Sequence, residues 1–492
     1  MVRRALLLAA CLSVIGAMVL PTAGTAGPRA IRKWSQEWLA LNHTRYDNAA
    51  TAAYERQIGY GKGALSAPDV LHGRAGEDVR MSTPSFAGNQ NEFQIDINPT
   101  DSHFAIGASN DGRQSGTGVY ATRDGGKTWF ARDLPLGISS CCDPGVAYGA
   151  DGTAYFINLG FDAFHIMKST NNGQTWQRMT DIVPPDDRTN IVVDNGSTSP
   201  FKGRVYVTYT DFGTTGATNE IKLYYSDDGA VTWTGPVNVS HTGQSGLPYP
   251  QSSQPRVADD GTVYVGYQYY PDGTYTSAQD RIAKSTNGGV NFAASTLISA
   301  GPHLQGGLDL GDQRGYFAVN AGCTTFRHRS FPIIGVDPTN SQIVYAEWAG
   351  GNLEQTYTCG SLHGYHSDIL FSRSTDGGAH WSAPLKVNDD PPGHDQYYGW
   401  MDVTPDGEIW IGWHDRRDDP NNFKHVWYGD RSTDGGLTFG TDKRVGDVPS
   451  LPSDFIGDYA GLAAASGLVL PMWWDSRNSS SGDPYTQSIR LG

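Results

Sequence analysis

The sequence predicts an all-β fold, a β-propeller, on the strength of three observations. A short segment, Thr122-Arg-Asp-Gly-Gly-Lys-Thr-Trp129, recurs with variations six times along the 492-residue chain. Pairs of apolar strands recur between its copies, at a period of tens of residues. Glycine is abundant, at 61 residues, as is typical of a protein with many turns. Such an array predicts sheets repeated around one axis in a single domain, where length alone would suggest about three domains.

The recurring segment has the residues of a tight turn. An Asp or Asn side chain accepts hydrogen bonds from backbone amides just ahead of it, and glycine adopts positive φ without strain. The closing Trp or Phe offers a large apolar plate for packing between sheets. We interpret the segment as a turn that joins the third strand of each sheet to the fourth. Its turn residues are Asp124, Asn171, Asp228, Asn287, Asp376 and Asp434.

Residues 1–26 are typical of a secretory signal peptide. Arg3 and Arg4 precede an apolar run, and small residues lead to Ala26. We expect cleavage after Ala26, which removes Cys11 and makes the formal net charge of −15 more negative by two. The sequence therefore predicts a secreted, extracellular protein.

Residues 27–90 differ from the repeats that follow. Trp34, Trp38 and Leu41 have helix-like spacing, and glycine, serine and proline dominate the stretch that leads to residue 90. We predict a short helical prefix followed by a linker. The β-propeller domain is placed at residues 91–492.

Strand pairs with alternating, β-branched or aromatic residues recur seven times after residue 90. The first pair is Phe93–Ile97 and Phe104–Ser109, and the last is Tyr459–Ala463 and Leu468–Trp474. The last unit ends without a recurring turn. Seven units favour seven blades, with six as the alternative. A strand from near the N-terminus would complete the last blade and leave no open edge.

Composition disfavours several classes of partner. The negative net charge makes nucleic acid and anionic membranes poor partners. No stretch after residue 26 approaches about 18 uninterrupted apolar residues, so we predict no membrane span. We find no Gly-x-Ser-x-Gly elbow, phosphate-binding loop or EF-hand pattern, and predict no cofactor and no metal site. Structural calcium on loop carboxylates stays open, and we expect a monomer.

Four cysteines remain after the signal segment, and export makes disulfides the expected state. Four cysteines allow three connectivities. We favour Cys323–Cys359, within one long insertion, and a bond between the adjacent Cys141 and Cys142. The alternative for the adjacent pair is two unrelated partners or free thiols.

Polar residues gather in the loops that would line the mouth of the propeller, a usual ligand site. In a four-stranded blade, the loop before the first strand and the loop after the second open on the same face. Each polar residue there could also be a turn cap or a solvated charge. Our candidates for acid–base or nucleophilic chemistry are Asp143, Glu347, Asp415, Asp458 and Tyr459. Our candidates for substrate binding are Arg113, Arg188, Gln254, Tyr398, Arg416 and Arg477.

Two Asp-Arg pairs occupy equivalent places in adjacent units. Asp415-Arg416 follows Trp413, and Arg477 stands two residues after Asp475. An arginine held by a neighbouring carboxylate is suited to grip an anionic substrate bidentately. The alternative is a salt bridge that only rigidifies the loop.

The recurring turn resembles the Asp-box, or BNR repeat, of the sialidase (neuraminidase) superfamily, and the resemblance extends from about Phe93 to the end of the chain. Phe93-Gln-Ile-Asp96 is similar in position to the family's Phe-Arg-Ile-Pro signature, whose arginine binds the sialic acid carboxylate; here Gln94 holds that place. Phe326-Arg-His-Arg329-Ser-Phe-Pro332 is similar too, but follows four of the turns and so falls in another blade. Glu347 and Tyr459 resemble the family's Glu–Tyr nucleophile pair in residue type and late position.

The resemblance implies a glycoside hydrolase with an extracellular glycan as substrate, an exo-α-sialidase or a related exo-glycosidase. Such an enzyme on another sugar needs two carboxylates across the mouth, and their separation decides retention or inversion. One alternative is a polysaccharide lyase, with a Tyr or His base and an arginine that neutralises the uronate. The other is a glycan- or protein-binding propeller without catalysis.

Overall fold

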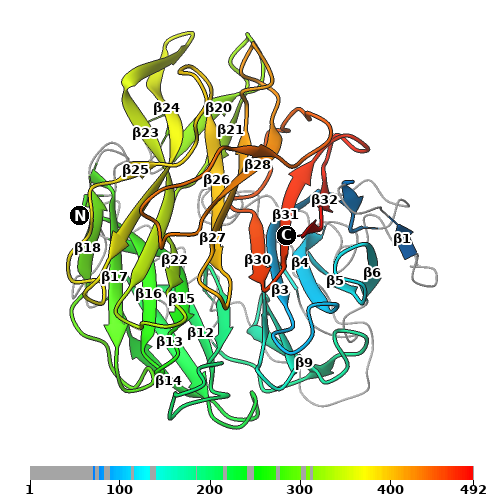
Figure 1. Cartoon of the computed structure of the whole chain (residues 1–492), viewed down its shortest axis with the longest axis vertical. Helices are drawn as coiled ribbons and strands as arrows, with labels where there is room; N and C mark the ends of the chain where they lie inside the picture. The colour runs from blue at the N-terminus through cyan, green and yellow to red at the C-terminus, as the bar shows by residue number, and fades with distance from the viewer. Residues whose placement is uncertain are drawn as a thin grey trace, which may run out of the picture. The chain divides into compact units, whose positions relative to one another are not determined.

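The computed structural model describes eleven segments of the chain, all within one compact unit, Asn42–Gly492. Strands, turns and loops make up these segments (Figure 1). None of their residues belongs to a helix long and apolar enough to cross a membrane. The signal segment, most of the prefix and Arg113 lie outside the described residues. The described residues are 70–72, 77–82, 89–111, 116–132, 140–183, 186–213, 219–240, 249–272, 277–300, 306–310 and 314–490.

The described strands form seven antiparallel sheets. The first contains β1 (Val70–His72), β3 (Gln90–Ile97), β4 (Ala105–Asp111), β5 (Gly116–Thr122) and β6 (Thr128–Arg132). The second contains β7 (Cys142–Tyr148), β8 (Ala154–Leu159), β9 (Phe164–Ser169) and β10 (Gln177–Arg178). The third contains β11 (Asn190–Val193), β12 (Val205–Phe212), β13 (Asn219–Ser226) and β14 (Thr234–Asn238).

The remaining sheets follow in chain order. The fourth contains β15 (Tyr249–Val257), β16 (Val263–Tyr270), β17 (Gln279–Ser285) and β18 (Thr296–Ala300). The fifth contains β19 (Gly307–Asp309), β20 (Gly315–Ala318), β21 (Thr325–His328), β22 (Ile333–Val336), β23 (Val344–Cys359), β24 (Leu362–Ser374) and β25 (Leu385–Lys386). The sixth contains β26 (Gln396–Val403), β27 (Ile409–Asp415), β28 (Val426–Ser432) and β29 (Lys443–Arg444). The seventh contains β2 (Val79–Arg80), β30 (Gly461–Ala465), β31 (Leu468–Asp475), β32 (Asp483–Thr486) and β33 (Ile489–Arg490).

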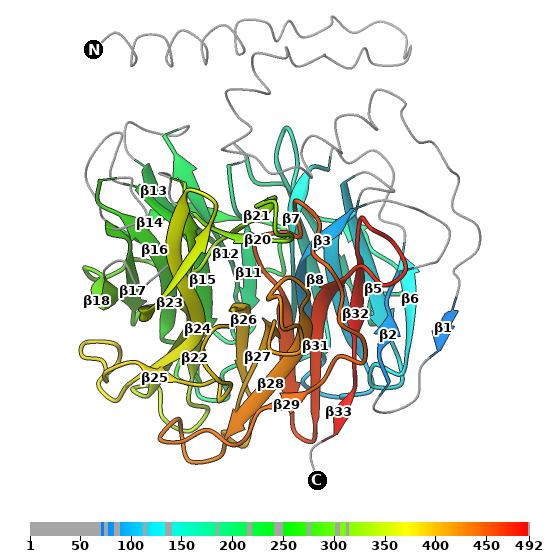
Figure 2. The same cartoon turned by 90° about the horizontal axis from the view of Figure 1, so that it is seen from above.

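The innermost strands of the seven sheets form a closed ring. They contact one another in the order β3, β7, β11, β15, β22, β26 and β30, and β30 in turn contacts β3. Residues of all seven line one central channel. In Figures 1 and 2 the red last sheet accordingly lies beside the blue first sheet. The fold is therefore a β-propeller, and its seven sheets match the seven predicted strand pairs.

A strand from the N-terminal side completes the last sheet, as the sequence predicted. In β2, Val79 pairs with Thr486 and Arg80 with Tyr485 of β32. The short strand β1 pairs with β6 at the outer edge of the first sheet. Both strands lie in the segment interpreted as a linker, which therefore contributes to the propeller.

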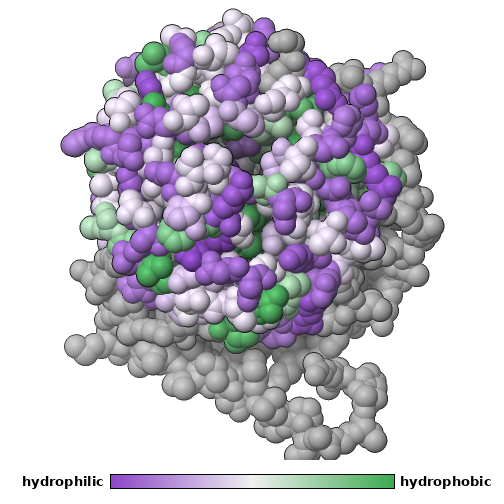
Figure 3. All heavy atoms as spheres, turned by 60° about the horizontal axis from the view of Figure 1, so that its bottom comes forward, coloured by the Kyte–Doolittle hydropathy of each residue, from purple (hydrophilic) through white to green (hydrophobic). Residues whose placement is uncertain are grey.

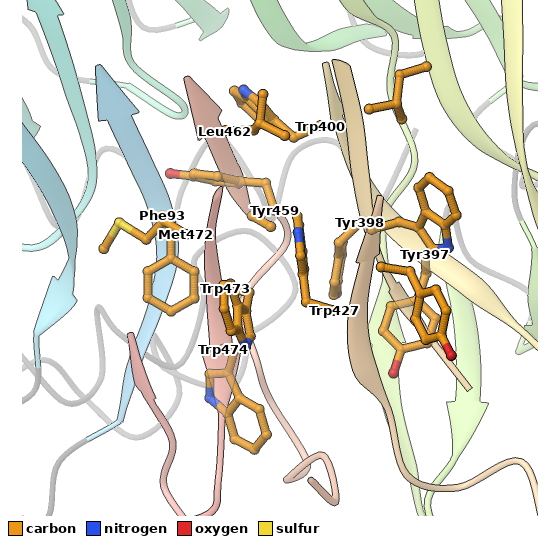
Figure 4. Packing of buried hydrophobic residues seen from close by; sticks show 14 of the residues in the cluster. Phe93, Tyr397, Tyr398, Trp400, Trp427, Tyr459, Leu462, Met472, Trp473 and Trp474 are labelled. Atoms are coloured by element: carbon orange, nitrogen blue, oxygen red, sulfur yellow. The ribbon is translucent and has the colours of Figure 1, made fainter. Parts of the chain in front are cut away.

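The apolar core lies between neighbouring sheets. Between the sixth and seventh, Trp427 stacks on Trp473 with their ring centroids 5.8 Å apart (Figure 4). Similar clusters fill the spaces between the other pairs of sheets. Outside, hydrophilic residues predominate on the face shown in Figure 3, and apolar ones lie there in small separate groups. Burial between sheets is thus what holds the blades together.

The recurring turns join third to fourth strands in six sheets, as expected. In each, the backbone N–H four residues after the Asp or Asn donates to its Oδ1, at 2.8 to 3.2 Å. The Thr or Ser two residues before donates its hydroxyl to the same oxygen. Trp129 is fully buried and donates its indole N–H to Gly126 O at 3.1 Å. The segment therefore has the structural role that its residues indicate.

The fifth sheet carries an extension that the other sheets lack in the described part of the chain. The hairpin of β23 and β24 is long, and β19 pairs with β24 and with β20, which pairs with β21. A disulfide joins Cys323, in the turn after β20, to Cys359 at the end of β23. A second disulfide joins Cys141 to Cys142. Both predicted pairings are therefore present.

Candidate functional site

Four of the inner strands share one irregularity near their start. In β3, β7, β15 and β26, two residues oppose a single residue of the next strand, which is a β-bulge. The first of the two has positive φ in each: Glu92 (59°), Asp143 (50°), Ser252 (60°) and Tyr398 (50°). A non-glycine residue in this conformation costs roughly 1–2 kcal/mol. Bulges re-aim side chains, and strain of this kind clusters at functional sites.

These bulges surround a hollow at the mouth of the ring, which we call the basin. Six of the seven sheets contribute to it, because each inner strand starts at this end of its blade. The third-to-fourth turns lie at the opposite end, since the strands alternate in direction. The described lining of the basin consists of Glu92, Cys142, Asp143, Asp187, Arg188, Gln251, Ser252, Arg314, Arg327, Arg329, Asp458 and Tyr459.

Three arginines converge on Asp458 at one side of the basin. Arg327 grips its carboxylate with two nitrogens, at 2.8 and 2.7 Å, and Nε of Arg329 lies 3.5 Å from Oδ2. Burial raises the pKa of Asp458, but the charges of Arg327, Arg329 and Arg314 outweigh it and lower that pKa overall. Burial and the other two guanidiniums lower the pKa of Arg314. Such crowding of cations favours an anionic ligand.

The extension of the fifth sheet supplies two of these arginines. Arg314 directly precedes β20, and Arg327 lies on β21. Since side chains alternate along a strand, Arg327 faces the basin while the neighbouring His328 is fully buried on the other side. The Cys323–Cys359 disulfide ties the β20–β21 hairpin to the end of β23. The extension is therefore the support of the cationic side of the basin.

Tyr459 directly follows Asp458 in the chain and packs under a further arginine, Arg188. The guanidinium carbon of Arg188 lies 3.7 Å from the centroid of its ring. Burial raises the pKa of Tyr459 well above its usual value; Arg188 opposes this, and the charges of Asp143 and Glu92 add to it. The Tyr459 hydroxyl is buried, and no described group lies within hydrogen-bonding geometry of it. Tyr459 is therefore a neutral phenol with a proton to give.

Asn110, at the end of β4, connects the two acids near Tyr459. Its Oδ1 accepts from the backbone N–H of Asp143 at 2.9 Å, and its Nδ2 donates to Oε2 of Glu92 at 2.5 Å. Glu92 in turn lies 4.0 Å from Nη2 of Arg327. One amide thus ties the carboxylate of Glu92 to the backbone of Asp143 on the neighbouring inner strand.

The structure brings four of the predicted residues together in the basin: Asp143, Arg188, Asp458 and Tyr459. Gln254 lies behind Arg188 and, with its oxygen turned toward it, accepts from both terminal nitrogens at 3.0 and 3.1 Å. Tyr398 does not line the basin. Its buried hydroxyl faces two backbone carbonyls, those of Arg327 and Gly457, at 2.7 and 2.6 Å. Gln254 and Tyr398 therefore support the site from behind.

The predicted Asp-Arg pairs lie elsewhere. Asp415 accepts from Trp413 Nε1 at 2.7 Å and from Arg417 Nη2 at 2.8 Å. Arg477 makes the equivalent bond to Asp475, at 2.6 Å. The partner of Asp415 is thus Arg417, two residues on, and not Arg416. These pairs are the loop-rigidifying salt bridges that stood as the alternative.

Arg416 has a different place again. It is fully buried, 5.4 Å from the ring centroids of Phe317, Phe326 and Tyr397, and donates to Asn422 O at 2.7 Å. A guanidinium enclosed by aromatic rings stabilises the interior and does not reach the basin.

Glu347 is also outside the basin. Its carboxylate is fully buried on β23 against Gly399, and neither oxygen has a hydrogen-bond partner among the described residues. Burial raises its pKa well above the usual value. The acids beside Tyr459 are therefore Glu92 and Asp143, and not Glu347. Gln94 lines the central channel rather than the basin.

Sequence reasoning missed the residues that give the basin its cations. Arg327 and Arg329 belong to the segment Phe326–Pro332, which was set aside because it follows four recurring turns. Arg329 reaches the mouth because it stands just before the inner strand β22, whereas Arg327 reaches it on β21 of the extension, a hairpin that no local sequence pattern predicts. Asn110 and Glu92 were not among the candidates, because nothing in the sequence singled them out.

In the described part of the chain, no group of three or more His, Cys, Asp or Glu side chains is arranged to hold a metal ion. The prediction that no cofactor is needed stays a prediction, and structural calcium stays open.

No protein-family model matches the chain, and no curated protein matches it. Among solved structures, an α-L-arabinofuranosidase from Fusarium graminearum is 12% identical over 73% of this chain and 96% of its own, with a TM-score of 0.47. An ulvan lyase of polysaccharide lyase family 25 is 14% identical over 83% and 96%, with a TM-score of 0.48. YCF48 bound to a D1 peptide is 13% identical over 88% and 97%, with a TM-score of 0.44. The order of the sheets, rather than these distant likenesses, establishes the fold.

Proposed function

We propose that the protein is a secreted glycoside hydrolase that acts on extracellular glycans bearing an acidic sugar, as a sialidase-like exo-glycosidase. The observation that carries this proposal is the composition of the basin. Four arginines, four acidic side chains and one neutral phenol meet at one mouth of the propeller, and three of the arginines crowd around one acid, Asp458. The basin contains the groups that binding and cleavage of a carboxylated glycoside need.

The cationic side binds the carboxylate of the sugar. Arg314, Arg327 and Arg329 present guanidinium groups, which match a carboxylate in a planar, bidentate way. Asp458 keeps the fork of Arg327 in place through two short hydrogen bonds. The binding energy of the charged group then fixes the orientation of the sugar above Tyr459.

Tyr459 acts as the nucleophile. Its oxygen forms a bond to the anomeric carbon while its proton passes to the carboxylate of Glu92, and Asp143, which enters this step as the carboxylic acid, protonates the departing glycosidic oxygen. In the second step Asp143 takes a proton from water, the water oxygen replaces Tyr459 on the carbon, and the phenol regains its proton from Glu92. Two displacements give overall retention of configuration. A neutral phenol suits this task because it does not repel the negatively charged sugar.

The test is turnover of reporter glycosides of sialic acid and of glucuronic acid by the protein freed of residues 1–26. Tyr459→Phe should lower kcat at least about 100-fold while the acidic sugar still binds. Tyr148→Phe is the matched control, because its buried hydroxyl also lacks a described partner but it lines the central channel. Failure of the wild type to cleave any acidic glycoside, or full activity of Tyr459→Phe, would refute the proposal.

A polysaccharide lyase is the second candidate, favoured by the stacking of Arg188 on Tyr459. A cation against the ring stabilises the phenolate, a base that can abstract the proton next to a carboxylate neutralised by arginines. Ultraviolet absorbance from an unsaturated uronate product would identify this chemistry. Binding without any turnover would instead indicate a glycan-binding propeller.

Export and a monomeric state belong to the proposal. Two disulfides suit an oxidising, extracellular setting. Mass spectrometry of protein from the culture medium should show both bonds and the loss of residues 1–26. Light scattering should give the mass of one chain.

A further inference from the structure

We propose that Cys142, bonded to Cys141 behind it, is a sugar-binding surface of the basin, an apolar platform on which the C–H face of the bound sugar rests. The inference rests on the proposed function, because the ligand is the acidic sugar of the same basin. Of the described residues that line the basin, all except Cys142 present charged, amide or hydroxyl groups. A pyranose has one apolar face, and a site built only of polar groups leaves that face without a partner.

Tyr459 does not offer its ring as that partner. Arg188 covers the ring at 3.7 Å, and the ring centroid of Phe331 lies 6.5 Å from that of Tyr459. Trp400 packs against it as well, with the centroids 6.2 Å apart (Figure 4). Tyr459 is also the single aromatic residue among those that line the described basin. Sugar stacking on an aromatic face, the usual solution, is therefore not open to this site.

Cys142 provides the alternative surface. Its sulfur is bonded to that of Cys141, so it carries no thiol hydrogen and is an apolar, polarisable group. Both cysteines are only 2% exposed, and they pack with Leu159 and Phe164 in the core between the second and third sheets. Cys142 therefore connects an apolar core directly to a polar basin.

The platform is also held rigidly next to Asp143. Cys141 donates its backbone N–H to Leu159 O at 2.8 Å. After the pair, two hydrogen bonds hold the backbone of Asp143. Its N–H donates to Asn110 Oδ1 at 2.9 Å, and its carbonyl accepts from Thr189 Oγ1 at 2.8 Å. A bond between adjacent side chains restricts the backbone that leads into Asp143. The pair therefore sets the distance between the sugar face and the acid that protonates the leaving group.

The experiment compares two probes on the wild type and on the double variant C141S/C142S. The first probe is the methyl α-glycoside of N-acetylneuraminic acid, with methyl glucuronide beside it. The second is acetate, which has the carboxylate but no sugar ring. The variant should bind the methyl glycosides about 10-fold more weakly and acetate unchanged, because only the contact with the ring is lost. The variant C141A/C142M, which restores a thioether sulfur, should regain part of the affinity.

A second measurement does not depend on how well the variants fold. In saturation-transfer NMR on the wild type, the ring C–H protons of one sugar face should receive the strongest signal. Equal saturation of both sugar faces, or unchanged glycoside affinity in folded C141S/C142S, would refute the sugar-binding platform and leave the proposed function standing. A wild type that binds neither glycoside overturns the proposed function, and the platform with it.

Discussion

The two ends of the blades differ in what is repeated from one sheet to the next. At one end, six turns repeat both backbone and side chains, and the same Oδ1 accepts the same N–H each time. At the other end, four inner strands repeat a strained bulge but fill it with Glu, Asp, Ser or Tyr. Where conformation and side chain repeat together, the residues build the scaffold. Where the conformation repeats and the side chain changes, three of the four residues present different chemical groups to one basin, and Tyr398 supports it from behind.

The electrostatics of the two ends differ for the same reason. At the turns the carboxylates are exposed, and hydrogen bonds from Thr232 and Thr438 help lower the pKa of Asp228 and Asp434 to about 2. In the basin, burial is the largest influence and raises the pKa of Tyr459. A turn thus adds hydrogen bonds to a carboxylate that water already solvates. In the basin the groups are held away from water, and neighbouring charges shift their pKa values.

The comparison of the two ends predicts that substitution of Asp458 causes the largest loss of stability and turnover. Asp458→Asn removes the charge that Arg327 grips and that Arg329 and Arg314 face, so that three crowded guanidiniums lose one compensating charge. We expect a loss of about 3–5 kcal/mol in the free energy of unfolding, together with loss of turnover. Urea denaturation and the reporter assay measure the two effects. Asp434→Asn, the same change at a turn, is the control, and equal effects at both sites would break the comparison.

Within the turns, the loss of stability caused by truncating the closing aromatic residue should increase with the burial of that residue. Trp129 is fully buried, whereas Trp233, at the same place in another turn, is partly exposed. Trp129→Ala should lower the free energy of unfolding by about 3–5 kcal/mol, and Trp233→Ala by clearly less. Turnover per folded molecule should stay at the wild-type value in both. A change in kcat with Trp129→Ala would show that the turns also shape the site.

Asp96 accepts backbone N–H groups, as the turn aspartates do, but it is partly buried. It therefore tests whether burial changes the shift of an aspartate pKa from a decrease to an increase. It lines the channel and accepts from Ile97 and Tyr148, but burial raises its pKa to about 7. With the folded pKa above the unfolded value, its contribution is complete below about pH 4 and is lost as pH rises through 7. The loss amounts to at most about 4 kcal/mol.

Asp96→Asn should remove this dependence. Urea denaturation between pH 4.5 and 8 should show the free energy of unfolding of the wild type falling relative to the variant, with the difference constant well above pH 7. Parallel curves for the two proteins would mean that the channel solvates Asp96 fully.

The smallest effect is expected at the turn acids themselves. The pKa of Asp434 is lowered to about 2, so its contribution is present above the ordinary value of 3.8 and is lost as pH falls through 2. Asp434→Asn should remove that acid-side decline and change the free energy of unfolding by no more than about 1 kcal/mol. Asn287→Asp is the reciprocal variant and should introduce such a decline. Thermal melts between pH 5 and 2 measure both.

Much of the scaffold could be predicted because its causes are local. The turn residues, strand pairs and closing aromatics each follow from neighbours within about ten positions. The disulfide pairs and the strand that completes the last sheet were also predicted, since cysteine spacing and an open edge limit the choices. Asp143, Arg188, Asp458 and Tyr459 were found because each stands just before or at the start of an inner strand.

The arginines of the extension could not be found in this way. Arg314 and Arg327 reach the basin only because β19 pairs with β24 and because Cys323 is bonded to Cys359. Asp415 and Arg416 looked as suitable as Asp458 and Arg188 in the sequence. They lie at the end of β27 and directly after it, but their side chains turn to Arg417 and to buried aromatic rings.

By itself, the sequence determined the kind of blade, its turns and the face on which polar groups gather, because these follow from short-range hydrogen bonding and hydrophobic periodicity. Only the tertiary structure decided which of those polar groups share one basin. That choice depends on long-range pairing of the extension and on the burial of each charge among partners distant in the sequence, and neither is encoded in any single stretch of residues.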